Sequence, residues 1–157
     1  MSTDLSHIDK EGNTVMVDVG MKSVSERTAV ASGKVLFPES VYSQLSEQGF
    51  VHKKGGIIQT AIIAGIQAVK RTSDLIPLCH QLMLSKVDID IQPFEDALHI
   101  KCMVKCTGKT GVEMEALTGV SVSALTIYDM CKALSHDILI TDIKLEMKTG
   151  GKHEFSR

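Results

Sequence analysis

The residues best suited to chemistry lie in the stretch 111–135, which reads GVEMEALTGVSVSALTIYDMCKALS. Its charged side chains are Glu113, Glu115, Asp129 and Lys132, and every other residue there is small, apolar or hydroxyl-bearing. Such a segment is typical of a protein interior, where a charge is costly unless it is paired or used. Two interpretations stay open: internal ion pairs, or an active site that presents two carboxylates and a Lys–carboxylate pair to a substrate.

The spacing of these four side chains limits how they can meet. Asp129 and Lys132 are three residues apart and share one face of a helix. Glu115 has nearly the same azimuth as Asp129 on an unbroken helix but lies about 21 Å away along the axis. Either the helix begins after Glu115 and the chain folds back, or another subunit completes the site. We favour the second subunit, because two largely apolar helices are too much surface for a small domain to hide.

Other candidate residues lie in loops around the apolar helix expected over 57–71. Lys53-Lys54-Gly55-Gly56 precedes this helix and suits a phosphate, although on local grounds alone a solvated basic loop explains it somewhat better. His80 ends the run LIPLCH after the helix, where it would bind a ligand, shuttle a proton or merely cap the loop. The sequence KTGGK at 148–152 is either a solvated tail or a loop that closes over an anionic substrate.

Two further motifs predict no chemistry. Cys102 and Cys106 would share one face of a strand about 13 Å apart, too far for one zinc ion, so we interpret both as small core residues. The sequence TGKTG at 107–111 resembles a phosphate-binding loop, but the glycine that such a loop requires is Met103 here. We therefore expect a strand-to-helix turn at 107–111 and no metal ligands.

The elements that must position these residues follow from apolar periodicity. Alternation predicts strands at 15–19, 27–37 (with a bulge at Gly33), 85–92, 97–106 and 138–148. Helical periodicity predicts a short helix that begins at Pro38, a core helix over 57–71 and a long helix within 112–135. This order predicts an α+β fold with an antiparallel sheet and helices packed on one face, of the ferredoxin-like type.

Length and composition indicate one small domain that binds neither nucleic acid nor membrane. The 157 residues divide into a polar arm at 1–14, a catalytic domain at 15–148 and a flexible tail at 149–157. A net charge of −2 and an aromatic content of 4% are unlike a nucleic-acid-binding protein. The sequence shows neither a secretory signal nor a run long enough to span a bilayer. We expect a cytoplasmic protein with reduced cysteines.

Several longer motifs, taken together, resemble one known family. They are Val17-Asp18-Val19, Lys53-Lys54-Gly55, LIPLCH, TGKTGVEMEALT, LTIYDMCKA and KTGGK, in this order. The chain is similar over residues 7–152 to the MoaC family of cyclic pyranopterin monophosphate synthases, which act in molybdenum cofactor biosynthesis. The resemblance implies conversion of (8S)-3′,8-cyclo-7,8-dihydroguanosine 5′-triphosphate to cyclic pyranopterin monophosphate, with release of diphosphate. It also implies a ferredoxin-like subunit in a hexamer, a trimer of dimers, with the active site at the dimer interface.

The resemblance also implies roles for individual residues. Asp129 matches the family's principal catalytic residue, and Lys132, Lys54 and Lys148 are expected to act with it. Residues expected to bind substrate are Leu78, Cys79, His80, Glu113, Met114, Glu115, Asp18, Arg27 and Lys152. Our hypothesis gives proton transfer to Asp129 and Lys132, and recognition of the guanine-like edge to Glu113 and Glu115. Lys54, Lys148 and Lys152 would neutralise the triphosphate. No cofactor is expected, apart from magnesium carried by the substrate phosphates.

The chain departs from the family pattern at three places. Gly56 replaces an Asp after KKG, Gln81 replaces a Pro after LCH, and the tail HEFSR replaces a Ser-Gly-rich end. None of these changes removes an expected catalytic group, but the missing carboxylate at position 56 weakens the cap of the following helix. Two other functions remain as alternatives, namely a non-catalytic ligand-binding module and an RNA-binding sheet, and the low aromatic content counts against the second.

Overall fold

The computed structural model describes residues 7–53 and 55–157. Its elements in chain order are β1 (Ser25–Leu36), α1 (Glu39–Glu47), β2 (Val51–His52), β3 (Gly55–Gly56), α2 (Ile57–Val69), α3 (Thr72–Leu75), β4 (Leu84–Phe94), β5 (Ala97–Gly108), α4 (Glu113–Cys131), β6 (Leu139–Thr149) and β7 (Phe155–Ser156). All strand pairs are antiparallel.

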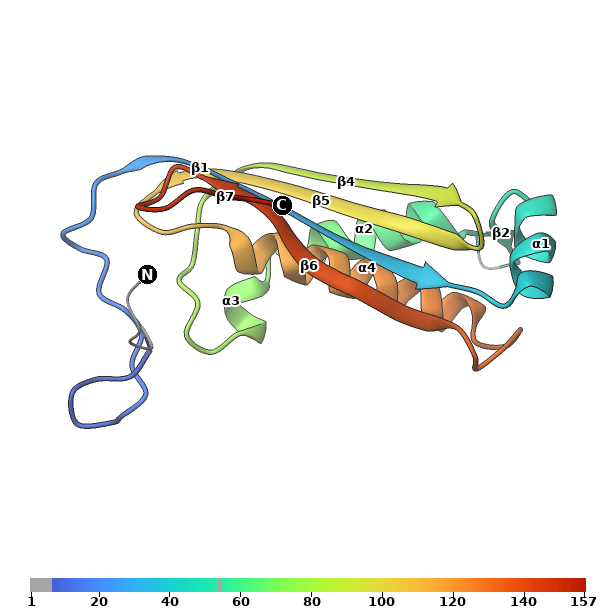
Figure 1. Ribbon diagram of the computed structural model, residues 1–157, viewed down its shortest axis with the longest axis horizontal. Coiled ribbons are helices and arrows are strands. Elements are labelled where there is room, and N and C mark those ends of the chain that lie inside the picture. The colour runs from blue at the N-terminus through green and yellow to red at the C-terminus, as the bar shows by residue number, and fades with distance from the viewer. Residues whose placement is uncertain (1–6, 54) are drawn as a thin grey trace.

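The main layer is a five-stranded sheet in the order β4-β5-β1-β6-β7, and α2 and α4 both lie against one of its faces (Figure 1). Leaving aside the short elements, the chain runs β1-α2-β4-β5-α4-β6, a β-α-β-β-α-β order. The first strand of this unit lies between the third and the fourth, as the split βαβ arrangement requires. This confirms the predicted α+β class, its antiparallel sheet and its ferredoxin-like character.

The core lies between the sheet and the two long helices. Alternate residues of β5, from Leu98 to Cys106, are at most 1% exposed and face the helices. Cys102 and Cys106 belong to this row, which confirms that they are core residues. The helices cross closely because a Cβ at Gly65 would lie 2.2 Å from Ser123 Oγ and 3.0 Å from the Gly119 carbonyl oxygen. The antiparallel contact of α2 with α4 therefore depends on small residues.

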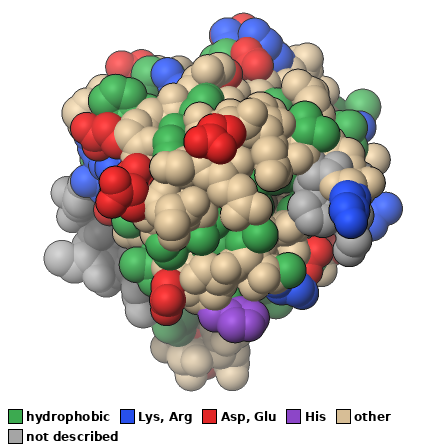
Figure 2. All heavy atoms as spheres, turned by 90° about the vertical axis from the view of Figure 1, so that its right-hand side faces the viewer, with side chains coloured by type: hydrophobic (Ala, Val, Ile, Leu, Met, Phe, Trp, Pro, Cys, Tyr) green, Lys and Arg blue, Asp and Glu red, His purple; other side chains and the backbone are tan. Residues whose placement is uncertain are grey.

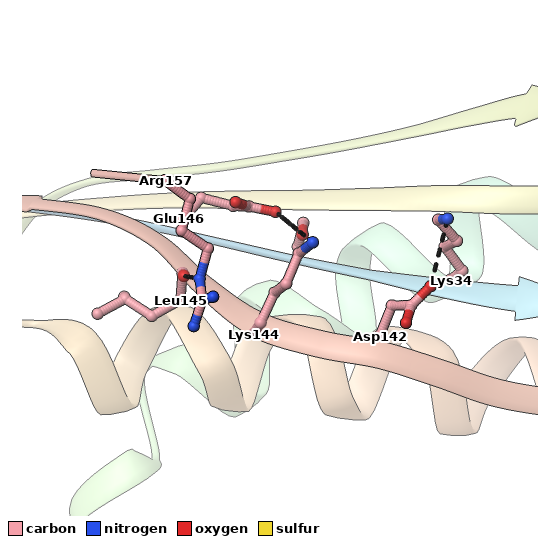
Figure 3. A network of polar contacts seen from close by, with 7 residues as sticks. Lys34, Asp142, Lys144, Leu145, Glu146 and Arg157 are labelled. Carbon is pink, nitrogen blue, oxygen red and sulfur yellow. Dashed lines mark hydrogen bonds and ion pairs between the residues drawn. The ribbon is translucent and has the colours of Figure 1, made fainter. Parts of the chain in front are cut away.

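The opposite face of the sheet is polar and open to solvent. Lys34 pairs with Asp142 at 3.2 Å, and Lys144 pairs with Glu146 at 3.6 Å (Figure 3). The side chains of these ion pairs are between 31% and 51% exposed, and solvent-exposed pairs contribute little to stability. This face is therefore a solvated surface that needs no covering helix.

Four local predictions differ from the structure. Residues 15–19 lie within the described part of the chain but form no strand, and Val15 and Met16 are exposed without a sheet to join. Pro38 is the N-cap of α1, since its ψ of 140° is not helical. The expected helix over 57–71 ends at Val69. The tail expected to be loop contains β7, which pairs with β6. The bulge predicted at Gly33 is confirmed by a register shift between Ser32 and Lys34.

Candidate active site

The candidate residues separate to the two ends of α4. This helix is continuous from Glu113 to Cys131, so the alternative in which it begins after Glu115 is wrong. Fourteen residues of helix place Glu115 and Asp129 about 21 Å apart. Helix α2 packs antiparallel to α4, and Ser123 Oγ donates a hydrogen bond to the Ala61 carbonyl oxygen at 3.0 Å. The start of α2 therefore lies on the same side as Asp129. We call the two regions the Glu115 end (residues 18–27, 76–87, 108–115 and 148–152) and the Asp129 end (residues 53, 55–56 and 129–132).

A cavity at the Glu115 end holds the most buried carboxylate of the candidate set. Glu115 is only 5% exposed and lines a cavity of about 470 Å³ together with His80. The other walls come from the end of α2, from α3 and from β4; they are Ile66, Val69, Lys70, Thr72, Ser73, Leu82, Met83, Leu84, Ser85, Lys86 and Val87. This lining combines apolar side chains with convergent polar and charged groups, as a small-molecule site requires.

The environment of this cavity disfavours negative charge. Burial raises the pKa of the Glu115 carboxyl, and the nearby charge of Glu113 raises it further. Burial likewise raises the pKa of the half-buried Cys79 thiol, with a smaller effect from Glu115. In the described part of the chain no cation forms an ion pair with Glu115. Glu115 is therefore a dehydrated carboxyl that a ligand with N–H donors can reach and satisfy.

Glu113 does not join Glu115 in the cavity. Its Oε1 accepts a hydrogen bond from Lys148 Nζ at 2.9 Å, and both side chains are partly buried. Lys148 is the penultimate residue of β6, so the pair links the start of α4 to the end of this strand. The two carboxylates thus point to different partners, because residues two apart on a helix do not share a face.

Arg27 is buried at the same end and holds loops together. It is 8% exposed, and its guanidinium donates to the carbonyl oxygens of Gly108 at 3.3 Å, Lys109 at 3.4 Å and Ser23 at 3.5 Å. Lys109 in turn donates from Nζ to the Gly20 carbonyl oxygen. Arg27 therefore fastens the start of β1 to the turn between β5 and α4.

The remaining candidates at this end are less enclosed. Asp18 accepts a bond from the Gly20 amide at 2.7 Å, which forms a local turn beside Lys109. Leu78 is half-buried in the loop that leads to His80, and Met114 is exposed at the start of α4. Lys152 is exposed in the turn between β6 and β7.

The Asp129 end is open. Lys132 Nζ donates to Asp129 Oδ1 at 2.6 Å, but the two side chains are 53% and 68% exposed. The hydrogen bond to Asp129 and its charge raise the pKa of Lys132. Lys53 is exposed, and the expected catalytic residue Lys54 lies outside the described residues. Figure 2 shows this side of the molecule, where acidic and basic side chains are interspersed on the visible surface.

Sequence reasoning missed several cavity residues. Lys70, Ser73 and Lys86 share the cavity with Glu115, although they lie far from it in the sequence. Alternation in the strand expected at 85–92 places Lys86 on its polar side, and no local signal links it to α4. The packing of α2 against both α4 and β4 brings these residues together.

Two general features of the described chain bear on the type of site. Among residues 7–53 and 55–157, no group of three or more His, Cys, Asp and Glu side chains is placed to hold a metal ion. None of the helices in the same described part has the length and apolar character needed to cross a membrane.

The fold and the site define a ferredoxin-like α+β protein with a ligand cavity at one end of its helix layer and a charged pair at the other. A family model described as MoaC family matches residues 16–151, and the chain belongs to this family. A protein of Xanthomonas axonopodis pv. citri is 52% identical over 154 residues, which cover 98% of this chain and 93% of the relative. Relatives from Campylobacter jejuni and Helicobacter hepaticus are 51% and 50% identical, each covering 94% of this chain, and 94% and 93% of their own lengths. All three relatives are named cyclic pyranopterin monophosphate synthase.

Proposed function

We propose that the protein is a cyclic pyranopterin monophosphate synthase. It converts (8S)-3′,8-cyclo-7,8-dihydroguanosine 5′-triphosphate to cyclic pyranopterin monophosphate and releases diphosphate, a step of molybdenum cofactor biosynthesis. Membership of the MoaC family and the names of relatives that share about half of its residues support this activity. The structural observation that carries the proposal is the buried Glu115 carboxyl in a cavity of about 470 Å³. This volume is within the usual range for a small-molecule site.

The cavity suits the guanine-derived ring of the substrate. A guanine-like edge carries a ring N–H and an amino group, and a carboxylate accepts from both. Glu115 offers such an acceptor at low hydration, where each hydrogen bond is stronger than in water. His80 lies on the same cavity wall and is placed to move a proton to or from the ring. Leu78 and Cys79 precede His80 and shape the loop that bounds the ring site.

The cations outside the cavity suit the triphosphate. Lys148 is held by Glu113 and remains partly exposed, and Lys152 follows it in the same hairpin. We assign both to the phosphates, together with Lys54. Magnesium, if the reaction uses it, arrives with the substrate phosphates, and the protein supplies no cofactor of its own.

Asp129 and Lys132 reach the ring only from a second subunit. About 21 Å of helix separates Asp129 from Glu115 within one chain. A two-fold dimer that pairs the Asp129 end of each subunit with the Glu115 end of its partner forms two equal sites. Exposed apolar side chains on the outer surface of the helix layer, Ile63 and Leu125, favour such pairing. We propose a hexamer of three such dimers, working in the cytoplasm, where the four unpaired cysteines would stay reduced.

The phosphate step balances with these groups. A ribose-derived hydroxyl oxygen bonds to the α-phosphorus, the bond between the α-phosphorus and the bridging oxygen breaks, and diphosphate leaves. A base takes the hydroxyl proton, and the lysines stabilise the charge that collects on the leaving diphosphate. During ring rearrangement, Asp129 and Lys132 exchange protons with ring nitrogen and carbon atoms.

Turnover of the cyclic nucleotide substrate tests this function. The purified protein is incubated with the substrate, and diphosphate and the pterin product are measured. We expect product from the wild type and losses of about 10²-fold or more in Asp129→Asn and Lys132→Ala. Lys144→Ala, which removes a lysine from the open face of the sheet, is the matched control and should keep wild-type turnover. Binding without product from the wild type would identify a non-catalytic ligand module, and near-normal turnover in Asp129→Asn would end its catalytic role.

A further inference from the structure

Lys148 lies in a strand segment that is held on both edges. Its backbone pairs with Ala29 of β1 on one side and with Phe155 of β7 on the other. The two-residue strand β7 therefore lies next to the part of β6 from which Lys148 contacts Glu113. We call residues 145–157 the C-terminal hairpin.

The turn of this hairpin is anchored to the start of β1. Ser25 Oγ donates a hydrogen bond to the Gly150 carbonyl oxygen at 2.7 Å. Gly150 has a φ of +86°, and a Cβ there would lie 1.8 Å from the Glu26 carbonyl oxygen. Only glycine permits this conformation and this close approach. The turn is thus seated against β1, and it directs the chain after Lys148 back along β6.

The other side of the hairpin is anchored by Arg157. Its backbone N–H donates to the Glu146 carbonyl oxygen at 3.0 Å, and its Nε donates to the Leu145 carbonyl oxygen at 2.9 Å. The guanidinium also lies 5.3 Å from the centre of the Phe155 ring. Figure 3 shows the Arg157 side chain folded back on to β6 beside Leu145 and Glu146. These contacts hold β7 against the segment that carries Lys148.

We infer that Ser25 and Arg157 are positioning residues for Lys148: they pin the two sides of the C-terminal hairpin, so that Lys148 stands beside Glu113 before substrate binds. A lysine that is already oriented loses less freedom on binding a phosphate, and misplacement by about 1 Å would slow the reaction. The role rests on the proposed function. It is an alternative to the expectation that residues 148–152 form a loop that closes over the substrate, and the hydrogen bonds on both sides of the hairpin favour it.

Single substitutions with matched controls give the first test. Ser25→Ala removes the hydroxyl at the turn, and Arg157→Ala removes the side-chain bond to β6. Each should lower kcat/KM by about 3- to 10-fold, the effect of one lost hydrogen bond. Ser121→Ala removes a hydroxyl that donates to the Leu117 carbonyl oxygen within α4. Lys34→Ala removes the ion pair with Asp142 on the solvent-exposed face of the sheet. Both controls should stay within about 2-fold of the wild type.

A double-substitution comparison separates positioning from general structural damage. In a Lys148→Ala background, Ser25→Ala and Arg157→Ala should cause almost no further loss of kcat/KM, because they act through the lysine that is already absent. The same loss in both backgrounds would overturn the inference, as would wild-type kcat/KM in both single variants.

Amide hydrogen exchange without substrate tests the hairpin independently of turnover. Arg157→Ala should speed exchange at Lys148 and Phe155 while leaving the middle of β5 unchanged. Unchanged exchange at the hairpin would overturn the inference. A wild-type protein without turnover would instead reject the proposed function, and with it the need to position Lys148, even if the hairpin exchanged as expected.

Discussion

The two ends of α4 present their acidic residues in opposite ways. Glu115 is 5% exposed and lies in a cavity lined by residues of the end of α2, of α3 and of β4. The Asp129 side chain is 68% exposed and has an exposed lysine beside it. Both residues belong to one helix of small and apolar residues. What separates them is the position of the sheet and its loops, which cover the first turn of α4 and leave the last turn open.

This difference shows which half of the site a single chain can complete. The Glu115 end is already largely withdrawn from water: Glu113 accepts a hydrogen bond from Lys148, and Arg27 donates to the carbonyl oxygens of Gly108 and Lys109. Water still screens the Asp129 pair, so its electrostatic effect on a substrate is small until another surface covers it. The comparison therefore predicts unequal effects of substitution at the two ends.

Among substitutions at the Glu115 end, the largest effect is expected from Glu115→Gln. An amide offers one acceptor oxygen in place of two, so kcat/KM for the cyclic nucleotide should fall by about 10²-fold. The same variant should unfold at a higher temperature at neutral pH, because it removes a charge that burial disfavours. Steady-state kinetics and thermal unfolding of the same preparation check both parts. A less stable Glu115→Gln would contradict the assignment of a strained buried carboxyl.

The pH dependence of stability follows from the raised pKa of Glu115. The folded protein keeps this proton to higher pH than the unfolded chain, whose carboxyl titrates near 4.5. The group therefore supports folding most below pH 4.5, and its contribution falls as pH rises through the raised folded pKa. The stability difference between Glu115→Gln and the wild type should grow from pH 4.5 toward neutrality. A difference that is constant between pH 4 and 8 would show that Glu115 is not perturbed by folding.

Arg27→Leu should mainly affect stability. Three carbonyl oxygens lose their donor at a buried position, which should lower the free energy of unfolding by about 2–3 kcal/mol. Urea denaturation measures this loss. Arg71→Leu, which changes an exposed arginine next to α3, is the matched control and should stay within about 0.5 kcal/mol of the wild type. Equal losses in the two variants would show that Arg27 does not brace this end.

The smallest effect is expected at the open end, from Gly56→Asp. Gly56 is the N-cap of α2 with φ −70° and ψ 122°, which suits any residue, and it provides no side-chain cap. A Cβ there would meet only Gln59 carbons at 3.8 Å. The added carboxylate should stabilise the protein by a few tenths of a kcal/mol, the usual difference between Gly and Asp at this position. Destabilisation in urea would show that the start of α2 is not free to accept a cap.

Local patterns predicted most of the fold but only part of the site. The alternation of Leu98 to Cys106 and the apolar pattern of the long helix after Val112 predict directly which residues are buried. They do so because their periods match a strand and a helix. Which of Glu115 and Asp129 is buried depends on long-range packing, and the neighbouring residues in the sequence do not indicate it. The divergence of Glu113 from Glu115, the cavity lysines and β7 depend on the same contacts. The prediction of a strand at 15–19 is wrong because alternating residues form a strand only where a partner strand is available, and alternation alone does not supply one.

Mixing two inactive variants tests most directly the claim that the site joins opposite ends of two subunits. Glu115→Gln and Asp129→Asn are unfolded together, refolded as a mixture and assayed for pterin formation, beside each variant treated alone. A mixed two-fold dimer contains one site with both residues intact, so random pairing should restore about a quarter of wild-type activity. A mixture that is no more active than its parents would place Glu115 and Asp129 in separate functions and contradict the account.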